Sequence, residues 1–157
     1  MLDLDGSPIN VAHTSRLSDY DSLSQELQLL GHGDRHRYVA GLYYFEDDGF
    51  TSNPLHFFGE FGGPPIDSRY GFTTQAWSAY TQVDFDVTQR LTLTGGLRYT
   101  NEKKDIDRFY SDVTIPVPNI FTATAAGTFS DVTPLAIVAF KATDSINLYA
   151  KYSEGRF

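Results

Sequence analysis

The residues in this sequence that could do chemistry are few, and their spacing fits no catalytic motif. The chain has no cysteine, which excludes a disulfide framework, a thiolate metal site and a cysteine nucleophile. It contains no G-x-S-x-G elbow, P-loop, H-E-x-x-H motif or complete G-x-G-x-x-G fingerprint. Gly31 and Gly33 precede Arg35 and His36, a composition typical of a tight turn. We therefore predict that the protein is not an enzyme and needs no cofactor.

The histidines also lack the spacing of a metal site. They fall in segments predicted to be loops or turns, with no carboxylates at ligand spacing. Solvent-exposed imidazoles are therefore expected, and no metal site is predicted. The residues concerned are His13, His32, His36 and His56.

Ligand binding is the chemistry that the sequence favours. Aromatic side chains gather in two stretches, 48–71 and 104–128, which are predicted to be long loops. Loops on a rigid scaffold commonly carry recognition residues. Their aromatic rings could stack on a small ligand or a glycan, or pack the loops against one another. The candidate ligand-binding residues are Phe50, His56, Phe57, Phe58, Phe109 and Tyr110.

The strands that would position these loops show their sequence pattern most clearly at residues 75–101. Apolar and small residues alternate with polar ones from Trp77 to Phe85, and the alternation resumes from Leu91 to Thr100. A period of two indicates strands, here joined by a turn at 86–90. Each limb has about ten residues, and a tilted strand needs about nine to eleven to cross a bilayer.

The same pattern recurs along the chain and predicts the fold class. Short connections alternate with long ones, as the turns and loops of outer-membrane barrels do. We predict an all-β, up-and-down antiparallel meander of about six long strands, an open segment of a large transmembrane β-barrel. Residues 1–20 are predicted to be an irregular N-terminal segment, and 21–157 the barrel segment. The predicted strands are 22–30, 37–47, 73–86, 90–103, 129–141 and 146–155.

Aromatic residues mark both ends of the predicted apolar face. Phe85 and Phe140 lie beside short turns, and Phe45, Tyr99 and Tyr152 lie toward the opposite strand ends. Two such girdles around an apolar belt are typical of a lipid-facing barrel wall.

The opposite face is predicted to line a polar lumen. Its polar side chains could pair with one another across strands, or some could contact a further domain inside the barrel. The candidate lumen-facing residues are Arg98, Lys151, Tyr80 and Gln82.

Composition bounds the possible partners. The net charge is -8 and the basic residues are scattered, which argues against a nucleic-acid surface. No secretory signal is visible at the first residues, so either Met1 is not the native start or the membrane interpretation fails. No run of about eighteen apolar residues occurs either. The hydrophobic share of 41% still suits a spanning sheet, because half of its residues would face water.

Four phrases resemble the barrel of TonB-dependent outer-membrane receptors, in the order that this family uses. Two departures are Leu135, where the family usually has a basic residue, and the ending Gly155-Arg156-Phe157, where it usually has Gly-Phe. The phrases are SQELQL (24–29), YVAGLYYFEDD (38–48), AYTQVDFDVTQRLTLTGGLRYTNEKKD (79–105) and FSDVTPLAIVAFKATDSINLYAKYSEG (129–155).

This resemblance implies a function and a location. Receptors of this family sit in the outer membrane of Gram-negative bacteria and import a scarce ligand such as a ferric siderophore. A plug domain fills a barrel of about twenty-two strands, and the TonB energy-coupling complex supplies the work. The implied partners are outer-membrane lipid, the plug, which Arg98 or Lys151 would contact, the TonB complex and a small ligand.

The chain is expected to be an internal piece of such a receptor, because nothing in it resembles the plug or the TonB-interacting box. The alternative is a soluble β-sandwich or small β-barrel that acts as a binding module, for example for glycans.

Overall fold

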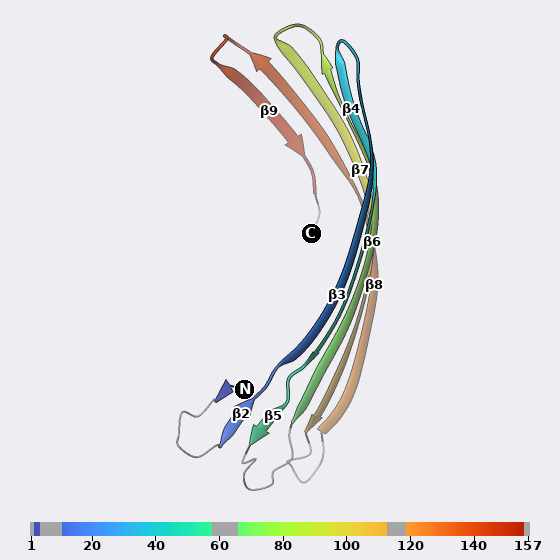
Figure 1. Cartoon of the computed structure of the whole chain (residues 1–157), viewed down its shortest axis with the longest axis vertical. Coiled ribbons are helices and arrows are strands. Elements are labelled where there is room, and N and C mark those ends of the chain that lie inside the picture. The colour runs from blue at the N-terminus through green and yellow to red at the C-terminus, as the bar shows by residue number, and fades with distance from the viewer. Residues whose placement is uncertain (1, 4–10, 58–65, 113–118, 156–157) are drawn as a thin grey trace. The chain divides into compact units, whose positions relative to one another are not determined.

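A computed structural model describes residues 2–3, 11–57, 66–112 and 119–155 of the chain. Within these residues, nine strands follow one another along the sequence (Figure 1). No helix in this described part is long and apolar enough to cross a membrane. The strands are β1 (Leu2–Asp3), β2 (Ala12–Thr14), β3 (Leu17–His32), β4 (His36–Ser52), β5 (Leu55–Phe57), β6 (Asp67–Asp86), β7 (Leu91–Asp112), β8 (Asn119–Lys141) and β9 (Asn147–Ser153).

Six of these strands form one sheet in which each strand lies beside the next one along the chain. The short β5 interrupts this order in the sequence, between β4 and β6, and belongs to another sheet. The order in this described sheet is β3-β4-β6-β7-β8-β9, and the sheet does not close on itself. Strands β1, β2 and β5 form a separate three-stranded sheet. The predicted all-β, up-and-down antiparallel meander is therefore confirmed.

Three short turns join the long strands into hairpins. The amide of Gly33 donates to the carbonyl of His36 at 2.8 Å, and the amide of Ala142 donates to that of Ile146 at 3.0 Å. In the turn between β6 and β7, the Thr88 hydroxyl oxygen accepts from the amides of Arg90 (3.1 Å) and Leu91 (3.0 Å). Such tight turns reverse the direction of the chain, so that each strand pairs with the one that follows it.

Most of the long strands run farther than the sequence pattern predicts, so the predicted loop boundaries at 48–71 and 104–128 are wrong. β4 continues to Ser52 and β7 to Asp112, with 17 and 22 residues respectively. The structure likewise places β2 and the start of β3 within the segment predicted to be irregular. Hydrogen bonds between neighbouring strands do not depend on side-chain polarity, so pairing persists where the apolar alternation fades. The predicted loops lie partly at 58–65 and 113–118, outside the described residues.

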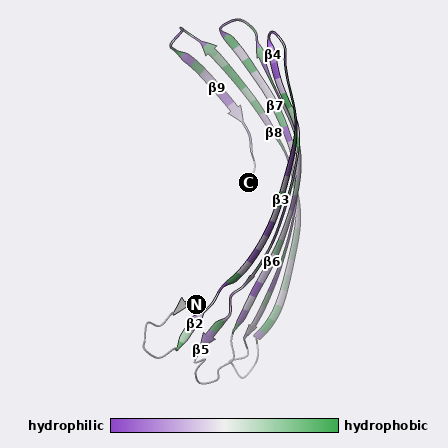
Figure 2. Ribbon diagram, in the orientation of Figure 1, coloured by the Kyte–Doolittle hydropathy of each residue, from purple (hydrophilic) through white to green (hydrophobic). Residues whose placement is uncertain are grey.

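The register between β8 and β9 shows how the strands separate polar from apolar side chains. Val138 pairs with Ala150 and Phe140 with Leu148, whereas Ile137 pairs with Lys151. Directly opposed residues project from the same side of a sheet, and successive residues from opposite sides. Figure 2 shows the result as repeated changes between hydrophilic and hydrophobic residues along the strands.

The described residues have almost no buried apolar core. Ala12, 9% exposed, is the buried hydrophobic side chain among them, while polar Thr51 and Ser78 are 0% and 1% exposed. Large apolar side chains such as Leu97 (51% exposed) and Leu148 (58% exposed) stay open to the surroundings. A water-soluble domain would cover this surface, because burial of apolar area is its main source of stability.

The Thr88 turn gives a direct test of hairpin stability. We expect Thr88→Ala to lower the free energy of unfolding by about 1 kcal/mol, since two backbone amides lose their acceptor. Trp77 is the single tryptophan, so its fluorescence during urea unfolding in detergent reports the change. Thr88→Ser keeps the hydroxyl and should match the wild type. Equal stability of the alanine variant would contradict the role assigned to the hydroxyl.

Candidate functional site

The described residues form two compact units. Unit 1 comprises Met1–Leu23, Glu46–Thr74 and Lys103–Gly127, and unit 2 comprises Ser24–Phe45, Gln75–Glu102 and Thr128–Phe157. All of the predicted lumen-facing residues belong to unit 2, and those predicted ligand-binding residues that the structure describes belong to unit 1.

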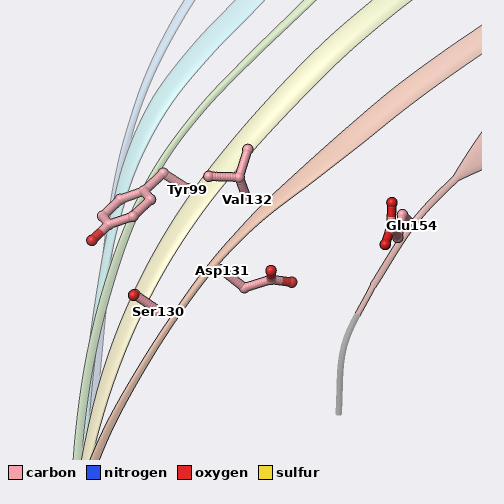
Figure 3. A pocket seen from close by; sticks show the side chains of 5 residues that line it. All are labelled: Tyr99, Ser130, Asp131, Val132 and Glu154. Atoms are coloured by element: carbon pink, nitrogen blue, oxygen red, sulfur yellow. The ribbon is translucent and has the colours of Figure 1, made fainter.

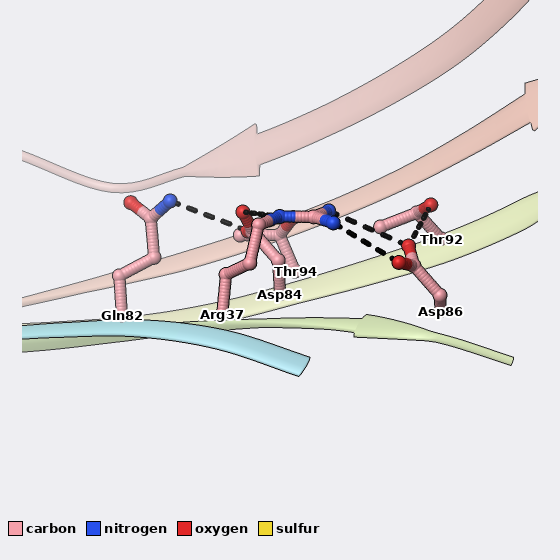
Figure 4. Close-up of polar contacts among 6 residues, drawn as sticks. All are labelled: Arg37, Gln82, Asp84, Asp86, Thr92 and Thr94. Atoms are coloured by element: carbon pink, nitrogen blue, oxygen red, sulfur yellow. Dashed lines mark hydrogen bonds and ion pairs between the residues drawn. The ribbon is translucent and has the colours of Figure 1, made fainter. Parts of the chain in front are cut away.

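In unit 2, one face of the sheet carries a network of ion pairs and hydrogen bonds. The Arg37 guanidinium on β4 donates to both carboxylate oxygens of Asp86 on β6, at 3.0 and 3.4 Å, and lies 3.6 Å from the carboxylate of Asp84. Thr92 and Thr94 on β7 donate to Asp86 (2.6 Å) and Asp84 (2.7 Å). Figure 4 shows these side chains bridging three adjacent strands. We call this side of the sheet the polar face of unit 2.

Tyr80 is held on the polar face by strands on either side of it. Its hydroxyl donates to the carboxylate of Glu26 at 2.7 Å and accepts from the Gln28 amide at 2.7 Å. Its ring lies over Gly41, where an added Cβ would clash with the Tyr80 ring carbon Cζ. The absence of a side chain at Gly41 is therefore what lets the tyrosine reach across β4 to β3.

Arg98 joins the same face through its guanidinium. It donates to the buried Ser78 hydroxyl at 2.8 Å and lies 5.8 and 5.9 Å from the ring centres of Tyr43 and Tyr80. A guanidinium between two aromatic faces gains cation–π attraction and is fixed in direction. The Arg98 side chain is therefore fixed by contacts with residues of its own sheet.

The two other predicted lumen residues differ from Arg98. The Gln82 amide reaches only the carboxylate of Asp84, at 3.4 Å. Lys151 is exposed and lies opposite Ile137 in the β8–β9 register. The ion pairs among the described residues do not include Lys151, and its side chain is exposed.

The prediction that Phe45 belongs to the apolar girdle is wrong. Tyr43 contacts Arg98 on the polar face, and Phe45 lies two residues farther along β4, on the same side. The sequence around Phe45 places aromatic rings on both faces of the strand, at Tyr43, Tyr44 and Phe45. The polarity of these residues alone therefore does not reveal which side of β4 belongs to the polar face.

The apolar face of unit 2 lies opposite and is uncovered. Trp77 and Tyr99 pack there with ring centres 5.2 Å apart. Phe85 and Tyr152, also predicted for this face, are 47% and 60% exposed. The face therefore combines aromatic residues with aliphatic ones and carries none of the network of Figure 4.

Unit 1 contains an arginine–aromatic cluster formed by β7 and β8. The ring centres of Tyr110 and Phe121 are 5.3 Å apart, and the Arg108 guanidinium lies 6.0 Å from the Phe121 ring. Arg108 and Tyr110 share one face because they are two residues apart in β7. Sequence reasoning did not select Arg108, because it chose aromatic and histidine side chains within the predicted loops. The period of two that continues through Arg108 and Tyr110 is the signal that could have placed Arg108 beside the selected tyrosine.

Nearby strands of unit 1 add a polar–aromatic contact. The buried Thr51 hydroxyl hydrogen-bonds with the Tyr20 hydroxyl at 2.9 Å and the Ser18 hydroxyl at 3.0 Å. Hydrogen bonds with the side chains of Thr51 and Ser18 lower the pKa of the Tyr20 phenol, and the bond with Thr51 has the larger effect. The Tyr20 ring lies 6.0 Å from that of Phe72, so β3, β4 and β6 are tied together at this point.

The structure does not place all predicted ligand-binding residues on one surface. Phe109 lies with its ring 5.7 Å from Arg69 and, as the neighbour of Tyr110 in β7, projects from the opposite face. Phe50, 42% exposed, lies on β4, and Phe57 lies on β5. His56 stacks on His13. Phe58 lies outside the described residues.

A shallow pocket in unit 2 offers no clear chemistry. Tyr99, Ser130, Asp131, Val132 and Glu154 line it, with the two carboxylates on different segments (Figure 3). No group of three or more metal-ligating side chains lies together among the described residues.

Gly41 gives a matched test of the Tyr80 contacts. We expect Gly41→Ala to lower the free energy of unfolding by about 1–3 kcal/mol, because the new methyl group displaces Tyr80 and breaks its hydrogen bonds. No atom of the described residues lies within 4 Å of a Cβ built at Gly95, so Gly95→Ala should be neutral or slightly stabilising. Urea titration of both variants measures the difference. Equal effects would refute the contact.

Comparison with known proteins places this geometry in a family. The chain matches the model of the TonB dependent receptor-like β-barrel over residues 3–155. The ferric yersiniabactin uptake receptor FyuA from Yersinia pestis is 18% identical, with 92% of this chain and 22% of that receptor covered at a TM-score of 0.79. The ferric-catecholate import receptor Fiu from E. coli K12, in its open form, is 12% identical, with 89% of this chain and 26% of that receptor covered at a TM-score of 0.61. A search of curated proteins finds no match.

At these identities the two receptors show the shared fold, and the chain spans well under a third of either one. The matched family consists of outer-membrane receptors and transporters of Gram-negative bacteria and is not an enzyme family. Because the family model covers residues 3–155, the chain belongs to the TonB-dependent receptor-like β-barrel family.

Proposed function

We propose that this chain forms part of the barrel wall of an outer-membrane receptor that imports a ferric siderophore. The observation that carries the proposal is the contrast between the two faces of unit 2. One face exposes large apolar side chains such as Leu97 and Phe140, and the other holds the network around Arg37. A sheet with hydrocarbon on one side and a wet lumen on the other requires this arrangement.

The same contrast argues against a soluble β-sandwich or small barrel. Such a domain would bury its apolar side chains between layers, whereas among the described residues the buried hydrophobic side chain is Ala12. Lipid contact is the environment that stabilises the exposed face.

The choice of a ferric siderophore has two supports. The two similar receptors are described as taking up ferric yersiniabactin and ferric catecholates. In unit 1, Arg108, Tyr110 and Phe121 combine a cation with aromatic rings, which suits a ligand that is both anionic and aromatic. Of the residues selected from the sequence, Tyr110 belongs to this cluster. Phe50, His56, Phe57 and Phe109 are proposed as further ligand contacts.

The polar face of unit 2 is proposed to meet the plug domain. Lys151 is the best candidate for a plug carboxylate, because its exposed ammonium group takes part in none of the ion pairs found among the described residues. Arg98 already binds Ser78 and two tyrosine rings. Together with Tyr80 and Gln82, it would offer the plug a shaped polar surface. The TonB complex would then act on the plug from the periplasm.

Contact of the apolar face with lipid is tested by placing an arginine on each face of the sheet in turn. We expect Leu97→Arg to lower the free energy of unfolding of the vesicle-inserted protein by about 2–4 kcal/mol, because an arginine on the lipid face is destabilising by this amount near the bilayer midplane. Gln82→Arg, on the polar face, should change it by less than about 1 kcal/mol. Urea titration of the vesicle-inserted protein gives both values. An unchanged Leu97→Arg variant would rule out a lipid contact.

Transport is tested with the protein that carries this segment, expressed in the outer membrane of a strain that lacks its own siderophore receptors. We expect TonB-dependent uptake of radioactive iron supplied as a catecholate or phenolate siderophore. Arg108→Gln should reduce uptake at limiting ligand by about tenfold, because charge-assisted hydrogen bonds contribute about 1.5–3 kcal/mol. Arg90→Gln, in the turn between β6 and β7 of unit 2, removes an arginine charge away from the proposed ligand contacts and serves as the control. Uptake of cobalamin or oligosaccharides without ferric siderophores would contradict the proposed ligand.

A further inference from the structure

One face of unit 1 brings two arginines from distant parts of the sequence to the same tyrosine. Arg16 immediately precedes β3, and its guanidinium donates to the Tyr70 hydroxyl on β6 at 3.3 Å. Arg108 lies on β7, the neighbour of β6 in the sheet. Both arginine side chains are exposed, whereas that of Tyr70 is half-buried. The two guanidinium groups are therefore open to a ligand.

Two contacts on the opposite face of unit 1 set the register between β6 and β7 at this level. The Arg69 guanidinium lies 5.7 Å from the centre of the Phe109 ring. A Cβ built on Gly71 would meet the carboxylate of Asp107. In an antiparallel pair, positions advance along one strand as they recede along the other. Both contacts fit the same alignment of the two strands.

This alignment puts Tyr70 opposite Arg108, since each lies midway between the residues that make those contacts. Directly opposed residues project from the same side of a sheet, with Cβ atoms about 4.5–5.5 Å apart. The Arg108 guanidinium lies 6.0 Å from the Phe121 ring, which stacks on that of Tyr110. Together with Arg16, these four residues form one surface, which we call the two-arginine surface.

The two arginines of this surface have no carboxylate bound to them. Neither takes part in an ion pair among the described residues. The nearby Tyr20 phenol reports the sign of the local field. After the hydrogen bonds with Thr51 and Ser18, the positive charge of Arg16 lowers the pKa of Tyr20, and the negative charge of Asp47 raises this pKa by less. The surface therefore favours an anion.

We propose that Arg16 and Arg108 together bind the anionic oxygens of a negatively charged ferric chelate, an inference that rests on the proposed function and names the class of siderophore. Guanidinium groups donate hydrogen bonds in fixed directions to charged oxygens. The backbones of β3 and β7 are separated by β4 and β6, a distance of about 14–15 Å. Arg16 crosses β4 to reach Tyr70 on β6, which brings its charge to the strand next to that of Arg108. One bulky chelate can therefore contact both arginines.

The charge of the chelate is what this surface would select. A ferric ion bound by a tris-catecholate ligand carries a net negative charge, whereas a ferric tris-hydroxamate is neutral. Binding either complex removes water from the guanidinium groups, but only the anionic one offers charged oxygens in return. The two-arginine surface should therefore favour ferric catecholates, and the rings of Tyr110 and Phe121 add contact area for catechol rings.

The experiment measures equilibrium binding of a radioactive ferric tris-catecholate and a radioactive ferric tris-hydroxamate. The membranes come from a strain that lacks its own siderophore receptors and expresses the protein that carries this segment. We expect Arg16→Gln to weaken binding of the tris-catecholate by about tenfold or more, because it loses hydrogen bonds to charged oxygens. Arg16→Lys keeps the charge without the planar fork and should lose less. Arg90→Gln, in a turn of unit 2, should bind like the wild type.

The comparison of the two complexes separates recognition of charge from a loss of structure. Wild-type affinity for the tris-catecholate in Arg16→Gln, or an equal loss for both complexes, would overturn the inference. A wild type that binds the tris-hydroxamate as tightly as the tris-catecholate would also overturn it, while leaving import of a ferric siderophore standing. Conversely, tris-catecholate binding that depends on Arg16 but is not followed by uptake would support the inference and contradict the proposed transport.

Discussion

The pairing of each long strand with the next one along the chain is the constraint on which the whole structure depends. A backbone in contact with hydrocarbon finds no water to bind its amide and carbonyl groups, so every such group must be satisfied within the sheet. Tight turns such as the one around Thr88 bring consecutive strands together. Once the strands are paired, the period of two sends successive side chains to opposite faces. Two chemically distinct surfaces then follow from one repeated pattern.

The two surfaces of unit 2 are stabilised by different interactions. On the polar face, carboxylates, hydroxyls and guanidinium groups bind across strands, with Arg37 linking β4 to β6 and Thr92 linking β7 to the same carboxylate. Individually, such exposed pairs contribute little, but they favour one register over its neighbours. On the apolar face, exposed Leu97 and Leu148 gain stability only where lipid replaces water. This division is the reverse of a soluble domain, whose apolar side chains meet inside.

Unit 1 places charged and aromatic side chains next to one another. Its strands continue beyond the apolar stretch and bring together side chains from distant parts of the sequence, such as Arg108 with Phe121 and His13 with His56. Each of these contacts lies on paired strands, where a rigid backbone fixes the side chains more closely than a free loop would. The same hydrogen-bonded strands thus support both the two faces of unit 2 and these contacts in unit 1.

The amino-acid sequence alone was enough to determine the fold class, the number of strands in the larger sheet and the family, because these depend on local patterns. Alternation from Trp77 to Phe85, tight-turn residues at 86–90 and characteristic phrases such as LTLTGGLRYT can all be read within short windows. Strand ends were misjudged, since hydrogen bonding to a neighbouring strand continues at Asp112 after the apolar signal has faded. The face of Phe45 was misjudged as well, because the rings of Tyr43, Tyr44 and Phe45 make the two sides of β4 alike in polarity.

Only the tertiary structure decided which distant side chains meet. The contacts of Tyr80 with Glu26, Arg98 with Tyr43, and His13 with His56 join different strands. Their partners are set by register, and a shift of one residue would send each side chain to the opposite face. Spacing along the chain carries no information about register between strands that are not linked by a tight turn. For this reason the histidine pair and the arginine–aromatic cluster became visible only after folding was known.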